Sequence, residues 1–208
     1  SRTIMDISLL LKGTLIGFSI AAPVGPIGVL CIRRTIARGR IAGFISGLGA
    51  ASADAVYGCI AGFGLTFISQ FLVEQQNILR LVGGVFLLYL GIKTFFAKSS
   101  EKELENNEKG LWSAYLSTFF LTLTNPITIL SFVAIFAGMG IVSTDGGYFS
   151  ALMLVLGIFI GSMLWWALLS GGASFFQKKI NAEGLAWINK ISGVIITGFG
   201  VAALFSLF

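Results

Sequence analysis

Prolines interrupt two apolar stretches of this 208-residue chain, and their positions point to a binding site. Pro23 and Pro26 lie in one uncharged run, and Asn125 and Pro126 lie in another. A proline inside a helix removes a backbone N–H and leaves a carbonyl of the preceding turn without its donor. At membrane depth, such a break persists only where protein or a water-filled cavity satisfies the freed groups. A matched pair of breaks in the two halves of a membrane chain predicts the binding site of a transporter.

The first break offers groups that suit an amino acid. A helix that restarts after Pro26 presents N–H groups and the positive end of its dipole, which favour a carboxylate. Gly25 and Gly28 allow the backbone to come close to a ligand. The prolines should also release carbonyl acceptors for an ammonium group, at Ser19, Ala22 and Thr122. The alternative is that the prolines only kink packed helices, because proline is common in membrane helices.

Asp54 is the only acid well inside a predicted span, and a carboxyl group at that depth is a functional candidate. A helical stripe of small residues should pack on a neighbour and turn Asp54 into the bundle: Gly43, Gly47, Ala50 and Gly58. There the carboxyl group can exchange protons or meet a substrate amine, or it can be a neutral structural hydrogen-bonding group. Tyr57, one turn from Asp54, and Trp165, in the fifth span, can line an amino-acid pathway or serve as packing.

The composition indicates a protein that lies in a bilayer. Apolar residues make up 56% of the chain, charged residues only 11%, and the mean hydropathy is +0.92. Soluble domains carry about 25% charged residues, and a membrane-spanning helix needs about 20 apolar residues. We therefore expect an all-α integral membrane protein with one domain over residues 1–208. The predicted spans are residues 7–32, 41–72, 78–97, 111–141, 147–173 and 185–207.

The two halves of the chain share features that predict an internal repeat. Pro26-Ile27 corresponds to Pro126-Ile127, one hundred residues later. Each half holds three spans, and because three is odd, the second copy must be inverted in the membrane. We therefore expect six helices in two inverted three-helix repeats, with helices 1 and 4 broken. The repeats cover about residues 7–97 and 111–207, and a charged cytoplasmic linker at 98–110 joins them.

The basic residues predict the orientation of the chain. The first, third and fifth links between spans carry most of the lysines and arginines, whereas the second link carries only Arg80. Basic links lie on the cytoplasmic side of membrane proteins. Both termini should therefore lie outside the cytoplasm. The basic residues of the first link are Arg33, Arg34, Arg38 and Arg40.

The remaining composition narrows the function. The chain has no histidine and one acid in its predicted core, so we expect no metal site, no cofactor and no enzymatic activity. The net charge of +5 serves topology, so nucleic-acid binding is not expected. Cys31 and Cys59 should lie at different depths, farther apart than the roughly 7 Å that a disulfide spans, so we predict free thiols.

Together these motifs resemble the LysE/RhtB family of amino-acid exporters over nearly the whole chain. The resemblance is carried by Pro23-Val-Gly-Pro26, Arg38-Gly-Arg40-Ile-Ala-Gly43, the run from Gly47 to Asp54, Leu88-Tyr-Leu-Gly91 and Asn125-Pro126. It implies export of amino acids, cationic ones such as lysine or arginine among them, or of related small metabolites. The export would cross the cytoplasmic (inner) membrane of a bacterium and would be driven by an ion gradient. The implied site comprises the broken first-span motif and Asp54.

The expected mechanism is proton-coupled antiport by alternating access, with Asp54 as the exchanging group. The expected partners are a small amino acid, protons or another coupling ion, and lipid, and the glycine stripes leave a homodimer open. One alternative is an exporter of another solute such as a divalent metal ion, which would need clustered carboxylates or histidines in the core. A second alternative is a membrane protein that transports nothing.

Overall fold

The computed structural model is all-helical over the residues that it describes. These are residues 2–23, 25–63, 71, 73–97, 108–125, 128–129, 131–132 and 147–207. The helices are α1 (Arg2–Ala21), α2 (Pro26–Arg38), α3 (Arg40–Gly62), α5 (Gln76–Phe95), α6 (Glu108–Leu123), α8 (Gly147–Gln177) and α9 (Ala182–Phe205). No strand occurs among them, in agreement with the all-α prediction.

Several of these helices are suited to a membrane. Four of them, α3, α5, α8 and α9, are long and apolar enough to cross one. The pair formed by residues 7–21 of α1 and by α2 passes the same test, and its two parts meet at 83°. The predicted break in the first span is therefore present. The apolar part of α6, Gly110–Leu123, is shorter, and most of the residues predicted to complete the fourth span lie outside the described part of the chain.

Two predicted boundaries were wrong. The helix α2 continues through Arg38, so Arg33 and Arg34 belong to a helix and not to the first link. That link is the single residue Gly39, whose φ of 96° lies in the left-handed region that favours glycine. Its backbone N–H caps α2 by donating to the carbonyl of Thr35. The helix α3 ends at Gly62, well before the predicted boundary at residue 72.

The small-residue stripe on α3 packs against α8, as predicted. A Cβ atom added to Gly47 would overlap the side chain of Trp166, and one added to Gly58 would press on Ile158. Ala50 and Asp54 are buried along the same interface. Small residues let two helices approach closely where lipid supplies no hydrophobic driving force between them. The stripe is therefore used inside the chain and turns Asp54 into the bundle.

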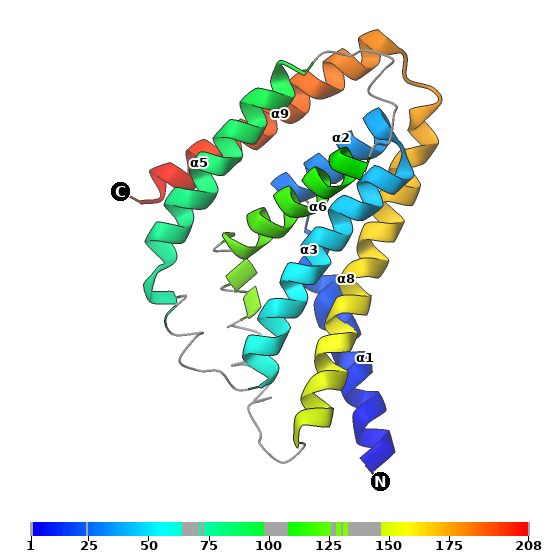
Figure 1. Ribbon diagram of the computed structural model, residues 1–208, viewed down its shortest axis with the longest axis vertical. Helices are drawn as coiled ribbons and strands as arrows, with labels where there is room; N and C mark the ends of the chain where they lie inside the picture. Colours follow the sequence, from blue (N-terminus) through cyan, green and yellow to red (C-terminus); the bar gives the residue numbers. More distant parts are fainter. Residues whose placement is uncertain are drawn as a thin grey trace.

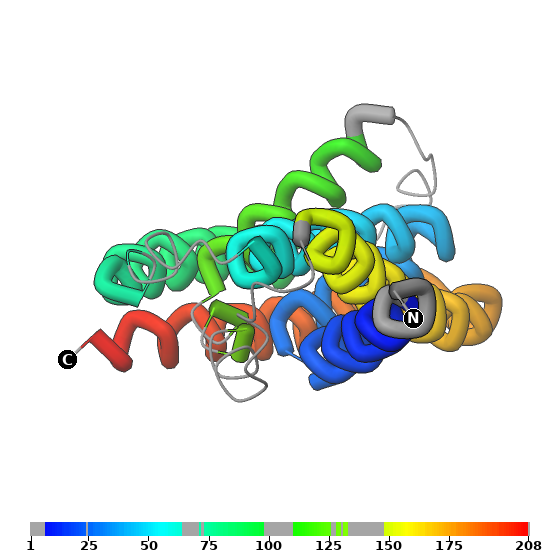
Figure 2. Tube along the Cα trace, turned by 90° about the horizontal axis from the view of Figure 1, so that it is seen from below, coloured from blue at the N-terminus to red at the C-terminus, as the bar shows by residue number. Residues whose placement is uncertain are grey.

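A second close helix contact joins α1 to α8. Gly13 and Gly17 of α1 lie against the backbone of α8, and Gly157 and Gly161 of α8 lie against the backbone of α1. On the other side of the molecule, α5 and α9 run together as a pair (Figure 1). Figure 2 shows the same arrangement from below, with α1 and α8 beside each other and α5 near α9. The helix α2 packs on α3, α8 and α9, and α6 packs on α3.

Candidate functional site

A cavity of about 600 Å³ lies between the two predicted breaks. Its lining comes from the end of α1, the start of α2, the first half of α5, the end of α6 and the end of α9. Among the lining residues are Pro23, Gly25 and Pro26 from the first break, and Thr124 and Asn125 from the second. Binding sites in proteins occupy about 300–1,000 Å³, so the space is adequate for a small metabolite. The two breaks thus share one hollow region.

The first break ends at a new helix start that borders the cavity. Gly25 caps α2 with extended backbone and no side-chain hydrogen bond, and Pro26 occupies the first turn. Proline is well suited to this position because it has no N–H to leave unpaired. The geometry of a helix gives the N–H groups of Ile27 and Gly28 no acceptor within α2. Ile27 lines the cavity, whereas Gly28 is buried and does not.

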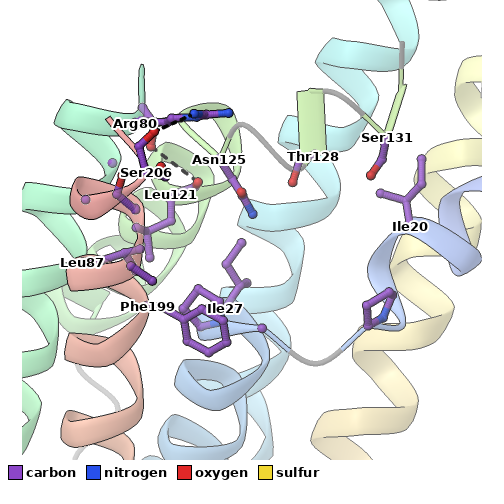
Figure 3. A pocket seen from close by; sticks show the side chains of 18 of the residues that line it. Ile20, Ile27, Arg80, Leu87, Leu121, Asn125, Thr128, Ser131, Phe199 and Ser206 are labelled. Carbon is purple, nitrogen blue, oxygen red and sulfur yellow. Dashed lines mark hydrogen bonds between the residues drawn. The ribbon is translucent and has the colours of Figure 1, made fainter. Parts of the chain in front are cut away.

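The second break presents polar side chains to the same cavity. Figure 3 shows Asn125 and Thr128 on one side of the cavity, with Ile27 and Phe199 on the other. The carbonyl of Thr122, predicted to be released, accepts a hydrogen bond from the backbone N–H of Asn125 at 3.3 Å. That part of the prediction was wrong, because a tighter turn replaces the lost helical bond. Pro126 lies outside the described residues.

Arg80 was missed as a site residue. In the sequence, Arg80 was only the single basic residue assigned to the second link. In the structure, Arg80 lies in α5 and lines the cavity. Its guanidinium donates to the carbonyl of Ser206 at 3.1 Å and to the side-chain oxygen of Gln76 at 3.3 Å. A cation that stands apart from the basic links was the one signal of this role.

Asp54 lies away from the cavity, in the α3–α8 interface. It is 2% exposed and is not among the described residues that line the cavity. Its carboxyl oxygen accepts a hydrogen bond of 2.7 Å from Ser162, whose hydroxyl in turn accepts one of 3.1 Å from the indole N–H of Trp166. Among the described residues, the hydrogen bonds of Asp54 therefore run to α8 and not to the two breaks.

Tyr57 and Trp165 are also not among the described residues that line the cavity. The Tyr57 hydroxyl donates to the carbonyl of Leu123, directly before the second break, and its ring lies 5.6 Å from that of Phe132. Trp165 packs edge-on against Phe18 of α1 at a centroid distance of 5.6 Å. Tyr57 is thus a neighbour of the second break through one hydrogen bond, and Trp165 contacts α1 before the first break.

The sequence matches one protein family, that of the LysE type translocator, over residues 18–207. The chain belongs to this family. It is 30% identical over 199 residues to the "Putative amino acid efflux protein YcgF" of Bacillus subtilis (strain 168), and the match covers 93% of each chain. It is 26% identical to the "Leucine efflux protein" of Salmonella choleraesuis (strain SC-B67), with 84% of each chain covered. No solved structure matches the chain.

This LysE type translocator is therefore a multi-pass α-helical protein of the bacterial inner membrane, in line with its apolar helices. Both of its cysteines, Cys31 and Cys59, are free thiols, as predicted. Among the described residues, no group of three or more Cys, Asp or Glu side chains could hold a metal ion. Among the described residues, the polar side chains that line the cavity are those of Ser19, Arg80, Thr124, Asn125, Thr128, Ser131 and Ser206.

Opposite the cavity, the translocator has a second polar region, which we call the packed end. Arg34 is 7% exposed there, and its guanidinium donates to the hydroxyls of Ser46 and Ser117 and to the carbonyl of Ala114. These bonds join α2 to α3 and α6. Beside it, Arg33 donates to Asn189 of α9 at 2.8 Å, and Asn189 donates to the carbonyl of Ala97. The sequence had suggested only loop charges at these two arginines.

Proposed function

We propose that this translocator exports an amino acid and binds it in the cavity between the two breaks. The observation that carries this proposal is that Pro23, Gly25 and Pro26 share one cavity with Thr124 and Asn125. Efflux of amino acids is the activity named for two of its relatives. The role is transport across the bilayer and not catalysis.

The lining supplies both kinds of group that an amino acid needs. The start of α2 at Pro26 and the guanidinium of Arg80 favour a carboxylate. The hydroxyls of Thr128 and Ser131 provide acceptors for an ammonium group. Because two different helix breaks contribute, a substrate in the cavity contacts both halves of the chain.

The test is to fill the cavity without disturbing the fold. A side chain at Gly25 would meet no atom within 4 Å of its Cβ, and its backbone, with φ of −116°, accepts any residue. In proteoliposomes loaded with amino acids, we expect Gly25→Leu to abolish release. The matched control is Gly172→Leu, on the exposed side of α8, where a Cβ also meets nothing within 4 Å. Equal export by the two variants would refute binding in this cavity.

The arrangement of the helices supports inverted repeats that work by alternating access. The first three spans correspond to α1 with α2, α3 and α5, and the last three begin with α6 and continue as α8 and α9. If each span of one half is exchanged with its counterpart in the other half, the α1–α8 contact becomes the α6–α3 contact. The exchange also leaves the α3–α8 and α5–α9 contacts in place, and all four contacts are present. The cavity reaches Arg80 and Ser206, whereas Ala97 and Asn189, at the other ends of α5 and α9, belong to the packed end. We propose that substrate enters when the packed end opens.

The packed end is the proposed cytoplasmic side, with both termini outside. It gathers the helix ends at the basic parts of the chain, which are Arg33 to Arg40, 98–110 and Lys178–Lys179. A cysteine placed at Ser100, in the linker outside the described residues, should react with an impermeant maleimide only from the cytoplasmic side. Labelling from outside in intact cells would reverse the proposed orientation.

Asp54 is the proposed proton-exchanging group of an antiport cycle. Among the described residues it is the one buried acid, and a carboxyl group at membrane depth is costly to retain without a function. Because it contacts Ser162 of α8 and not the cavity, gain or loss of its proton would act on the α3–α8 contact and so on the two repeats.

An isosteric substitution tests this coupling. Asp54→Asn keeps the size of the side chain and an acceptor for Ser162 but cannot ionise. We expect this variant to exchange amino acids across vesicles without a gradient, while efflux driven by a pH gradient is lost. Undiminished pH-driven efflux would assign the coupling to another group or another ion.

A further inference from the structure

Arg80 is the one ionisable side chain among the described residues that line the cavity. It extends from α5 beside the end of α9, where its hydrogen-bond partners among the described residues are neutral oxygens of Ser206 and Gln76. An arginine has five N–H donors in a rigid fork. These two bonds use one N–H on each terminal nitrogen of Arg80, so further donors remain for a ligand.

The rest of the described lining carries no negative charge. The walls are formed by apolar side chains, Ile20, Ile27, Leu87, Leu121 and Phe199, and by uncharged polar ones such as Thr128 and Ser131. Asp54, the acid that could have neutralised a cationic substrate, is packed against Ser162 in another part of the molecule. A lysine or arginine side chain in this cavity would have no counter-ion among the described residues and would share the space with Arg80.

We propose that Arg80 determines the substrate class: it binds the carboxylate of the amino acid and excludes cationic side chains, so that the cavity takes amino acids with apolar side chains. This inference rests on the proposed export of amino acids through the cavity. The walls that would meet the side chain are aliphatic and aromatic, and burying an apolar side chain there gains free energy in proportion to the buried area. A second cation held close to Arg80 in the same cavity is repelled by it.

The carboxylate binds to Arg80 through charge-assisted hydrogen bonds. These are stronger than the hydrogen bonds that the uncharged polar residues of the lining can form. Such bonds to charged groups are each worth more than tenfold in affinity. The ammonium group shares its carbon with the carboxylate, so it stays near Arg80 and turns toward the uncharged polar part of the lining, on the side where Figure 3 shows Thr128.

The experiment compares leucine with lysine as substrates in proteoliposomes that contain the full chain. The wild-type protein should export leucine at least tenfold more efficiently than lysine. Arg80→Gln should raise the leucine concentration for half-maximal transport by about tenfold or more. Arg80→Glu should reverse the charge of the cavity and shift the ratio of lysine to leucine export upward by at least about tenfold.

The matched control is Lys93→Gln, which removes one positive charge from an exposed position on the same helix α5. It should leave both substrates unchanged. Arg80→Lys retains the charge and should retain the preference for leucine, which keeps the inference testable if Arg80→Gln does not fold.

The outcomes separate the two proposals. Wild-type protein that exports neither leucine nor any other amino acid refutes the proposed function itself. Wild-type protein that exports lysine as efficiently as leucine leaves the exporter intact but overturns the inferred substrate class. Arg80→Gln and Arg80→Glu variants that both behave like Lys93→Gln overturn the assignment of Arg80.

Discussion

Arg34 and Arg80 are both arginines, but one is buried between packed helices and the other lines a cavity. Arg34 is 7% exposed, and three hydrogen bonds to neutral groups of α3 and α6 hold its guanidinium at the packed end. Arg80 borders a cavity, and its two bonds run to a backbone carbonyl after α9 and to a side chain on its own helix. The first arginine is part of the interior of the bundle, whereas the second faces space that a ligand can fill.

The surroundings explain this difference. At the packed end, helices run uninterrupted and close together, so that Gly49 lies against the backbone of Tyr115 and the hydroxyl of Thr118 bonds the carbonyl of Ser46. Around the cavity, the two breaks turn the backbone away and leave space that side chains do not fill. A buried polar group needs a full set of partners. The same residue type therefore holds helices together in one region and is available to a substrate in the other.

Two glycines test this comparison with the largest expected effect. A Cβ at Gly49 would overlap the carbonyl of Tyr115, so α3 and α6 must separate and the bonds of Arg34 must lengthen. We expect Gly49→Ala to lower the free energy of unfolding by about 3 kcal/mol, as overpacking of a helix contact does. Gly25→Ala, which meets nothing within 4 Å, should change it by less than about 0.5 kcal/mol. Denaturant unfolding in detergent measures both, and equal losses would contradict the distinction between the regions.

The two arginines provide the second test. A lysine keeps the charge but cannot reach acceptors on two helices with a planar fork. Arg34→Lys should therefore lower the free energy of unfolding by about 2 kcal/mol, since it leaves a buried cation and hydroxyls short of partners. Arg80→Lys should cost less than about 0.5 kcal/mol because Arg80 is only half-buried at the edge of the cavity. Thermal unfolding of both variants at one detergent concentration checks this, and a larger loss from Arg80→Lys would reverse the assignment.

The first break, the α3 stripe and the free thiols were predictable because proline positions and small-residue spacing act locally. The roles of Arg34 and Arg80 were not. In the sequence, each arginine served only as evidence for the orientation of the chain in the membrane. The groups that they contact lie far along the chain: Ala114 is 80 residues from Arg34, and Ser206 is 126 residues from Arg80. The position of Asp54 was predicted only in part. Its stripe indicated that it faces inward, but nothing in the spacing indicated that its contact would be Ser162 and not the cavity.

Two serines give the smallest and most selective test. Ser117 accepts a hydrogen bond of 2.7 Å from Arg34 and also donates to the carbonyl of Ala114, so Ser117→Ala removes one acceptor from a buried cation. A hydrogen bond to a charged group contributes about 1.5 kcal/mol or more, and we expect Ser117→Ala to lower the free energy of unfolding by about that amount. Ser131 lines the cavity, where water can replace a lost partner, so Ser131→Ala should cost less than about 0.3 kcal/mol.

The double variants Arg34→Lys with Ser117→Ala and Arg80→Lys with Ser131→Ala complete the comparison. Coupled side chains give non-additive losses, so the first pair should show an interaction energy of about 1 kcal/mol and the second pair none. Additive losses in the first pair would mean that Arg34 does not depend on Ser117, and the packed end would then be held by the helix contacts alone.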